Sequence, residues 1–203
     1  MNTYQHNSSD SELIRRIQSG DKKAFSDLYG DSFSNLCDFV HRYIDTPAIC
    51  EELVQELFLN IWRRREEWYP KGSVRAYLYK SARNRALDFL KHLEVERRYI
   101  EHQKFERETN RTAGSVDKPL RDEMSYMQEL SAAVSEAIDQ LPDRRKMIFL
   151  MSRDDGLTYR EIAEILDISV KTVETQMGRS LETLRQLLSN YMPVWALLFS
   201  GLV

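Results

Sequence analysis

The sequence predicts an all-α protein made of two small helical domains joined by a charged linker. Apolar residues recur at three- and four-residue steps through most of the 203 residues, and no segment keeps the period-two alternation typical of a strand. A charged stretch poor in aliphatic residues, 94–122, separates two groups of helical patterns. We therefore expect domains at 1–98 and 123–192, a linker at 99–122 and an apolar tail at 193–203.

Four helices are expected in the first domain. The first covers 11–19, and the second starts at Asp21. Thr46 and Pro47 are typical of a helix start, because Thr can cap a helix and Pro fits its first position. A fourth helix is expected over 73–93, with the serine at its start as the cap.

Four more helices are expected after the linker. The first two cover 123–140 and 143–155, and they are ended by Pro142 and Gly156. Two shorter helices follow, and the tight turn 167–169 joins them. Two short helices joined in this way form a helix-turn-helix signature.

The details of this signature favour double-stranded DNA as the ligand. Thr158 and Glu161 form a capping box, and the small Ala163 allows the second helix to approach closely. Asp167 stands in the turn where many such motifs have glycine. The second helix is capped by Ser169 and should turn a polar face toward base edges and phosphates of a major groove. That face consists of Lys171, Thr172, Thr175, Gln176 and Arg179.

A basic block in the first domain indicates a second kind of nucleic-acid contact. The whole chain has a net charge of −3, but residues 60–98 carry 11 Lys or Arg against 5 Asp or Glu, a net +6. Acidic segments flank this block, which indicates a phosphate-binding surface on a chain that also meets a basic partner. Aromatic residues such as Trp68 and Tyr69 interleave with the cations. Aromatic rings stack on unpaired bases at ~1–3 kcal/mol each, which suits melting DNA.

Other classes of protein are less well supported. The four histidines show no metal-ligand spacing and no glycine-rich loop is present, so we expect no cofactor, no metal and no enzyme activity. Cys37 and Cys50 are expected to be buried thiols. The N-terminus lacks a signal-peptide pattern and the apolar tail is too short to span a bilayer, so a cytoplasmic protein without stable membrane insertion is expected.

One alternative function shares the helix-turn-helix. A one-component transcription regulator would combine it with an N-terminal helical domain for ligand binding or dimerisation. This alternative predicts a ligand pocket, dimers and tight DNA binding without RNA polymerase. The basic, aromatic helix over 73–93 disfavours it.

Several stretches resemble the extracytoplasmic-function (ECF) subfamily of bacterial RNA polymerase sigma factors. Residues 20–40, 51–65 and 72–92 resemble the region 2 of that subfamily, in which the stretches QELFLNIW and RNRALDFL are specific in combination. Residues 141–185 resemble its region 4. The resemblance covers about 12–98 and 126–190, in the order found in the family. It implies a sigma factor that binds core RNA polymerase, directs promoter-specific initiation and is held inactive by an anti-sigma factor.

The resemblance also implies a role for each surface. The third helix would dock on the polymerase clamp helices through Glu51, Glu52, Leu53, Gln55, Glu56, Leu57 and Phe58. The minus-ten element would be opened and bound by Trp68, Lys71, Arg75, Tyr79, Lys80, Arg83 and Asn84. Region 4 would contact the polymerase flap and read the minus-thirty-five element through the helix that begins at Val170. The acidic linker would thread a polymerase channel, and no small-molecule substrate is implied.

Overall fold

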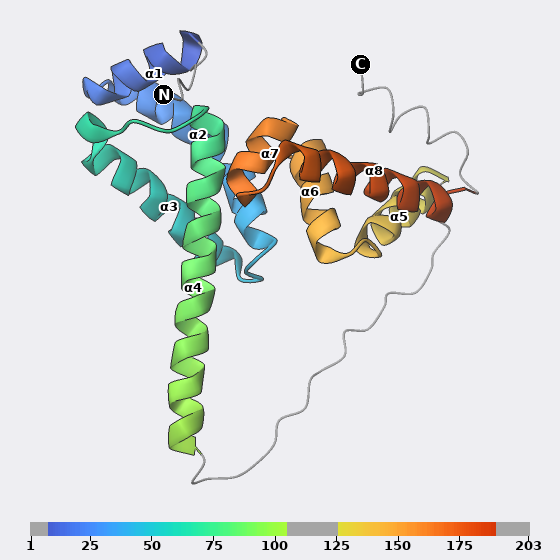
Figure 1. The fold of residues 1–203 in the computed structure, drawn as a ribbon. Coiled ribbons are helices and arrows are strands. Elements are labelled where there is room, and N and C mark those ends of the chain that lie inside the picture. Colours follow the sequence, from blue (N-terminus) through green and yellow to red (C-terminus); the bar gives the residue numbers. More distant parts are fainter. Residues whose placement is uncertain (1–7, 105–125, 190–203) are drawn as a thin grey trace. The chain divides into compact units, whose positions relative to one another are not determined.

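The computed structural model describes residues 8–104 and 126–189, and the regular structure in these ranges is entirely helical (Figure 1). This result confirms the predicted all-α class. The apolar tail 193–203 and most of the predicted linker lie outside the described residues.

The chain divides into two compact units. The first unit contains α1 (Ser8–Gln18), α2 (Lys22–His41), α3 (Pro47–Arg63), a short 3-10 turn η1 (Arg65–Glu67) and α4 (Val74–Lys104). The second contains α5 (Tyr126–Asp139), α6 (Asp143–Arg153) and α8 (Val170–Leu187). Residues 160–168, which include most of α7 (Tyr159–Leu166), group with the first unit by their contacts. The domain limits drawn from the sequence stay a prediction.

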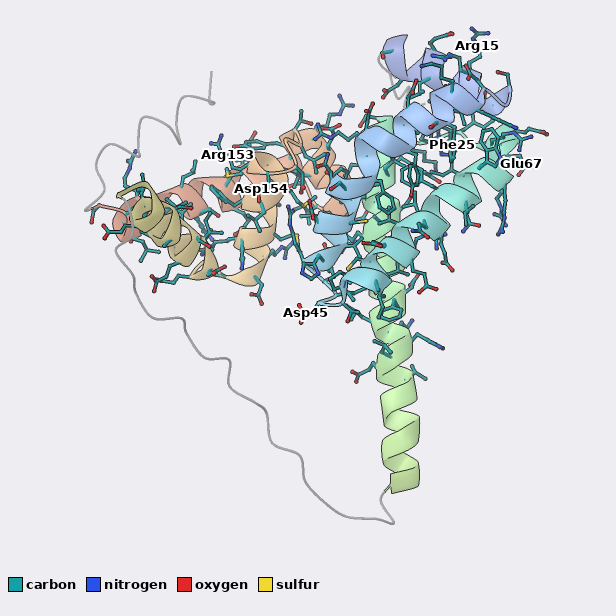
Figure 2. All side chains as sticks on the ribbon, turned by 180° about the vertical axis from the view of Figure 1, so that it is seen from behind. Arg15, Phe25, Asp45, Glu67, Arg153 and Asp154 are labelled. Atoms are coloured by element: carbon teal, nitrogen blue, oxygen red, sulfur yellow. The ribbon has the colours of Figure 1, made fainter. Side chains whose placement is uncertain are left out.

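The first unit is built where α2, α3 and α4 pack on one another. Phe25, labelled in Figure 2, lies on α2. Its ring centroid is 6.1 Å from that of Phe58 and 4.8 Å from that of Trp62, both on α3. Asp21 caps α2 by accepting the backbone N–H groups of Lys23 and Ala24. The bond from Ala24 contributes most to holding the pKa of this carboxyl below its usual value, and Arg16 adds to it. The predicted start of α2 is therefore confirmed.

The predicted starts of α3 and α4 are correct in position, whereas α1 begins at Ser8, three residues before the predicted start. Pro47 occupies the first turn of α3, whereas the side chain of Thr46 makes no capping hydrogen bond. Ser73 does cap α4, because its hydroxyl accepts the N–H of Ala76 at 3.0 Å. The predicted end of this helix, at residue 93, is wrong: α4 continues to Lys104.

The extension of α4 has a local cause. Residues 94–104 are rich in Glu, Arg, Lys and His, and most of these residue types keep their side-chain freedom in a helix. Val95 is exposed, so this part of the helix is not held by packing around that residue. The high charge that suggested a linker is thus compatible with a helix.

The N-terminus of α4 has a second cap that is distant in sequence. Asp10 on α1 accepts the N–H of Val74 at 3.0 Å, across 64 positions of the chain. Replacing Asp10 with alanine should lower the free energy of unfolding by ~1 kcal/mol, because this N–H loses its partner. Chemical denaturation followed by circular dichroism measures the change. Replacing Glu12, an exposed residue of the same helix, is the control, and equal losses from both changes would contradict the capping role.

The second unit is organised by the packing of α6 on α8. Ile148 and Met151 of α6 and Met177 and Leu184 of α8 are fully buried. This burial confirms the predicted inner face of α8 at these positions.

No helix within 8–104 or 126–189 has the length and apolar character needed to cross a membrane. In the same ranges, no group of three or more acidic, His or Cys side chains is placed to hold a metal ion.

Candidate nucleic-acid interface

The turn that precedes α8 adopts a backbone conformation that usually favours glycine. Asp167 has φ = 54°, in the left-handed region. Aspartate tolerates this region better than most residues, since its short side chain hydrogen-bonds locally. Asp167 therefore provides the geometry that glycine provides in many helix-turn-helix motifs. Ser169 then caps α8 by accepting the N–H of Thr172 at 3.0 Å, as predicted.

The predicted polar face of α8 lies at the surface of its unit. Lys171, Thr175 and Arg179 are exposed, and Thr172 and Gln176 are half-buried. The Thr175 hydroxyl donates to the backbone oxygen of Lys171 at 2.8 Å, which leaves its methyl group and oxygen lone pair for other contacts. The five residues therefore present cations, an amide and hydroxyls on the outer side of α8. Their DNA contacts stay a prediction.

A pocket of about 570 Å³ lies within the first unit, where the end of α3 and η1 meet α4. Its lining includes Leu57, Asn60, Ile61, Arg64, Glu67, Trp68, Tyr69, Tyr77, Ser81, Asn84 and Arg85. Glu67 marks the loop after α3 in Figure 2. The pocket thus combines two arginines and two asparagines with aromatic side chains.

The aromatic residues predicted to bind unpaired bases are buried. Trp68 is only 4% exposed, and its ring packs edge-on against Tyr77 at 6.0 Å. Tyr79 is also buried, with its ring 5.0 Å from that of Phe39. Neither ring offers a free face for stacking in this structure. The neighbouring Tyr69 is 74% exposed and does offer its ring to solvent.

The residues predicted to bind the minus-ten element do not all line the same pocket. Asn84 and Trp68 line the large pocket, whereas Arg75 and Tyr79 line a second pocket of about 240 Å³ beside α1 and α2. Lys71 is exposed, and Lys80 and Arg83 are half-buried. Within the large pocket, Asn84 and Trp68 lie with four polar or aromatic residues absent from the predicted set, which are Asn60, Arg64, Tyr69 and Arg85.

The exposed face of α3 differs from the predicted one in its apolar residues. Glu51, Glu52, Gln55 and Glu56 are exposed as expected. Leu57 and Phe58 are 2% and 1% exposed, so they belong to the core, and Leu53 is half-buried. Leu59, which the sequence analysis missed, is 51% exposed. A signal for it was present, because Leu59 lies three and seven positions after exposed residues, on the same face of the helix.

Comparison with known proteins identifies the family of the chain. Family models match in both halves, Sigma-70 region 2 over 28–94 and Sigma-70 region 4 over 131–184. The ECF RNA polymerase sigma-E factor of Haemophilus influenzae is 31% identical over 177 residues, which cover 85% of this chain and 92% of the relative. This chain belongs to the ECF sigma factors. It therefore confers promoter-specific initiation on core RNA polymerase.

A further relative is named for the same family, and two solved structures share the fold. The ECF RNA polymerase sigma factor SigK of Mycobacterium tuberculosis is 29% identical over 180 residues, covering 87% of this ECF sigma factor and 91% of SigK. CnrH, solved in complex with the cytosolic domain of CnrY, has the same fold with a TM-score of 0.58 and 20% identity. The match covers 90% of this chain and 99% of CnrH. RpoE of Bartonella quintana, solved with the anti-sigma factor NepR, gives a TM-score of 0.53 and 17% identity. The match covers 82% of this chain and 98% of RpoE.

The family assignment decides between the functions considered from the sequence. A one-component regulator would carry a ligand or dimerisation domain in place of region 2, but the region 2 model matches here. The alternative is therefore wrong. The ECF sigma factors are transcription initiation factors, and the family is not one of enzymes.

Proposed function

We propose that this sigma factor docks on the polymerase clamp helices through α3 and binds unpaired minus-ten bases at the pocket beside Tyr69. Region 4 would contact the polymerase flap and read the minus-thirty-five duplex through α8. One observation carries the proposal: the first unit contains both an exposed acidic face on α3 and a large polar pocket. A sigma factor needs both, because it must hold a basic protein surface and an opened strand together.

The pocket supplies the chemistry that an unpaired strand requires. Arg64 and Arg85 can neutralise phosphates, while Asn84 and Asn60 can bond base edges through their amides. Tyr69 offers a ring for stacking. Trp68 also lines the pocket, but its ring is packed and only 4% exposed, so its role in this proposal is to hold the loop rather than to stack on a base.

The face of α3 suits a basic partner with an apolar centre. Gln55 and Glu56 lie one turn before Leu59 and Glu52 lies two turns before it, all on the exposed face of the helix. Protein interfaces concentrate their binding energy in a few apolar anchors enclosed by a polar rim. Leu59 is the anchor in this proposal, and the acidic residues select the basic clamp helices.

We also propose that an anti-sigma factor holds the protein inactive in the cytoplasm. RpoE of Bartonella quintana, which shares the fold, was solved with the anti-sigma factor NepR bound, and CnrH was solved with the cytosolic domain of CnrY bound. Such a partner would compete with polymerase or DNA for the exposed surfaces described above.

Run-off transcription tests the proposed function directly. Core polymerase and genomic DNA are incubated with and without this chain, and the transcript ends are mapped. Defined start sites that require the chain are expected. Tight duplex binding by the chain alone, with no new start sites, would contradict the proposal.

Replacing Arg179 with alanine should weaken binding of the minus-thirty-five duplex by ~1–3 kcal/mol, if its guanidinium bonds a base edge. Fluorescence anisotropy with wild-type and altered duplexes measures both affinity and base preference. Replacing Arg185, an exposed arginine of the same helix outside the predicted face, is the matched control. If the two changes have equal effects on all duplexes, Arg179 contributes charge alone and does not read the sequence.

A further inference from the structure

An ion pair links the two surfaces of the first unit. The Nη1 atom of Arg85 on α4 donates to the Oε2 atom of Glu56 on α3 at 2.9 Å. The side chain of Glu56 remains 54% exposed, and that of Arg85 is 25% exposed. Each partner belongs to a different surface, because Glu56 lies on the acidic face of α3 and Arg85 lines the large pocket.

The two positions fix what the pair connects. Glu56 lies one turn after Glu52 and beside Gln55, so a basic surface that docks on α3 meets its carboxylate. Arg85 lies next to Asn84 and one turn after Ser81, and all three line the pocket. Any group that draws Glu56 away from α4 therefore changes the charge inside the pocket.

The physical chemistry of exposed ion pairs allows this exchange. Water reaches both side chains, Glu56 more than Arg85, so the pair is partly screened and can be replaced by another pair at modest cost. A cation of the partner that binds Glu56 leaves Arg85 without its counter-charge. The guanidinium then attracts a phosphate or a base edge more strongly than it does beside the carboxylate.

We propose that Arg85 is a minus-ten DNA contact which Glu56 keeps neutralised in the free sigma factor and which polymerase docking releases. This inference rests on the proposed function, since it uses α3 as the docking face and the pocket as the DNA site. Because coupling between two sites is reciprocal, a strand bound at Arg85 also frees Glu56 for the polymerase. The pair thus makes binding of polymerase and of unpaired DNA mutually favourable.

The test measures how the full chain, without polymerase, binds a single-stranded minus-ten oligonucleotide. Glu56→Gln should tighten binding about two- to fivefold, because an exposed ion pair has roughly that effect on an equilibrium. Glu52→Gln removes the same charge one turn earlier and should change the affinity less. Arg85→Gln should weaken binding, and the double variant Glu56→Gln with Arg85→Gln should bind no more tightly than Arg85→Gln alone.

The outcomes separate this inference from the proposed function. The inference is overturned if Glu56→Gln and Glu52→Gln increase the affinity for the oligonucleotide equally. It is also overturned if Glu56→Gln increases the affinity of a chain that already carries Arg85→Gln, or if the Glu56→Gln chain shows no measurable binding. With core polymerase bound, the advantage of Glu56→Gln should disappear, and its persistence would also overturn the inference. If the wild-type chain supports defined start sites in run-off transcription, any of these failures concerns the ion pair alone.

Discussion

Replacing Leu59 with aspartate is expected to abolish capture of core RNA polymerase while the fold remains intact. The side chain is 51% exposed on the face of α3 that carries the acidic residues, so an added charge there can stay in water in the free protein. In a complex, the same charge would be buried in the apolar centre of the interface. Changes at such an anchor cost ~2 kcal/mol or more, which is about 30-fold in affinity or greater.

Co-purification of the tagged sigma factor with core polymerase measures this loss, and circular dichroism verifies the fold. Leu57 provides the contrast, because it is buried and lines the floor of the pocket. Leu57→Asp should unfold the first unit, so its loss of polymerase binding would say nothing about docking. A Leu59→Asp variant that still captures polymerase would remove the exposed face of α3 from the interface.

The helix starts of this protein are predictable because their causes are local. Asp21, Pro47, Ser73 and Ser169 stand at the beginnings of α2, α3, α4 and α8, where residue type alone sets the capping or the backbone angle. The end of α4 was not predictable in this way. No glycine or proline stops the helix after residue 93, and charge by itself is no stop signal.

The functional site was harder to predict, because residue type does not reveal burial. Trp68 and Tyr69 are neighbours with similar rings, yet one packs into the unit and the other is exposed. Leu57 and Leu59 differ in the same way, although they lie only two positions apart on α3. Periodicity gives the two faces of a helix, but only the packing of α2 and α4 decides which face is inside.

Sequence patterns did not predict the long-range contacts. Asp10 caps α4 from 64 positions away, and the pair of Glu56 and Arg85 spans 29 positions. Neither contact follows a helical period. Both become visible only when the helices are placed side by side, and both involve the helices that carry the proposed polymerase and DNA surfaces.

Replacing Trp68 with alanine should reduce the free energy of unfolding of the first unit by ~3–5 kcal/mol, as expected for a large aromatic side chain removed from a core. The ring packs against Tyr77, and the backbone oxygen of Trp68 accepts a hydrogen bond from Gln18 on α1 at 3.0 Å. A cavity at this position therefore loosens the loop between α3 and α4 together with α1. Urea unfolding followed by circular dichroism measures the loss.

Replacing Tyr69 with alanine is the matched change, because it removes a neighbouring ring that is exposed. This variant should keep its stability but open promoters less well, with ~1–3 kcal/mol lost if the ring stacks on a base. Permanganate reactivity of unpaired thymines in the complex with polymerase measures opening, and duplex docking is measured in parallel. The two variants divide the aromatic pair into a residue that holds the loop and a residue that contacts DNA. If Tyr69→Ala opens promoters normally, the exposed ring has no part in melting, and the pocket must bind the strand through its arginines and asparagines alone.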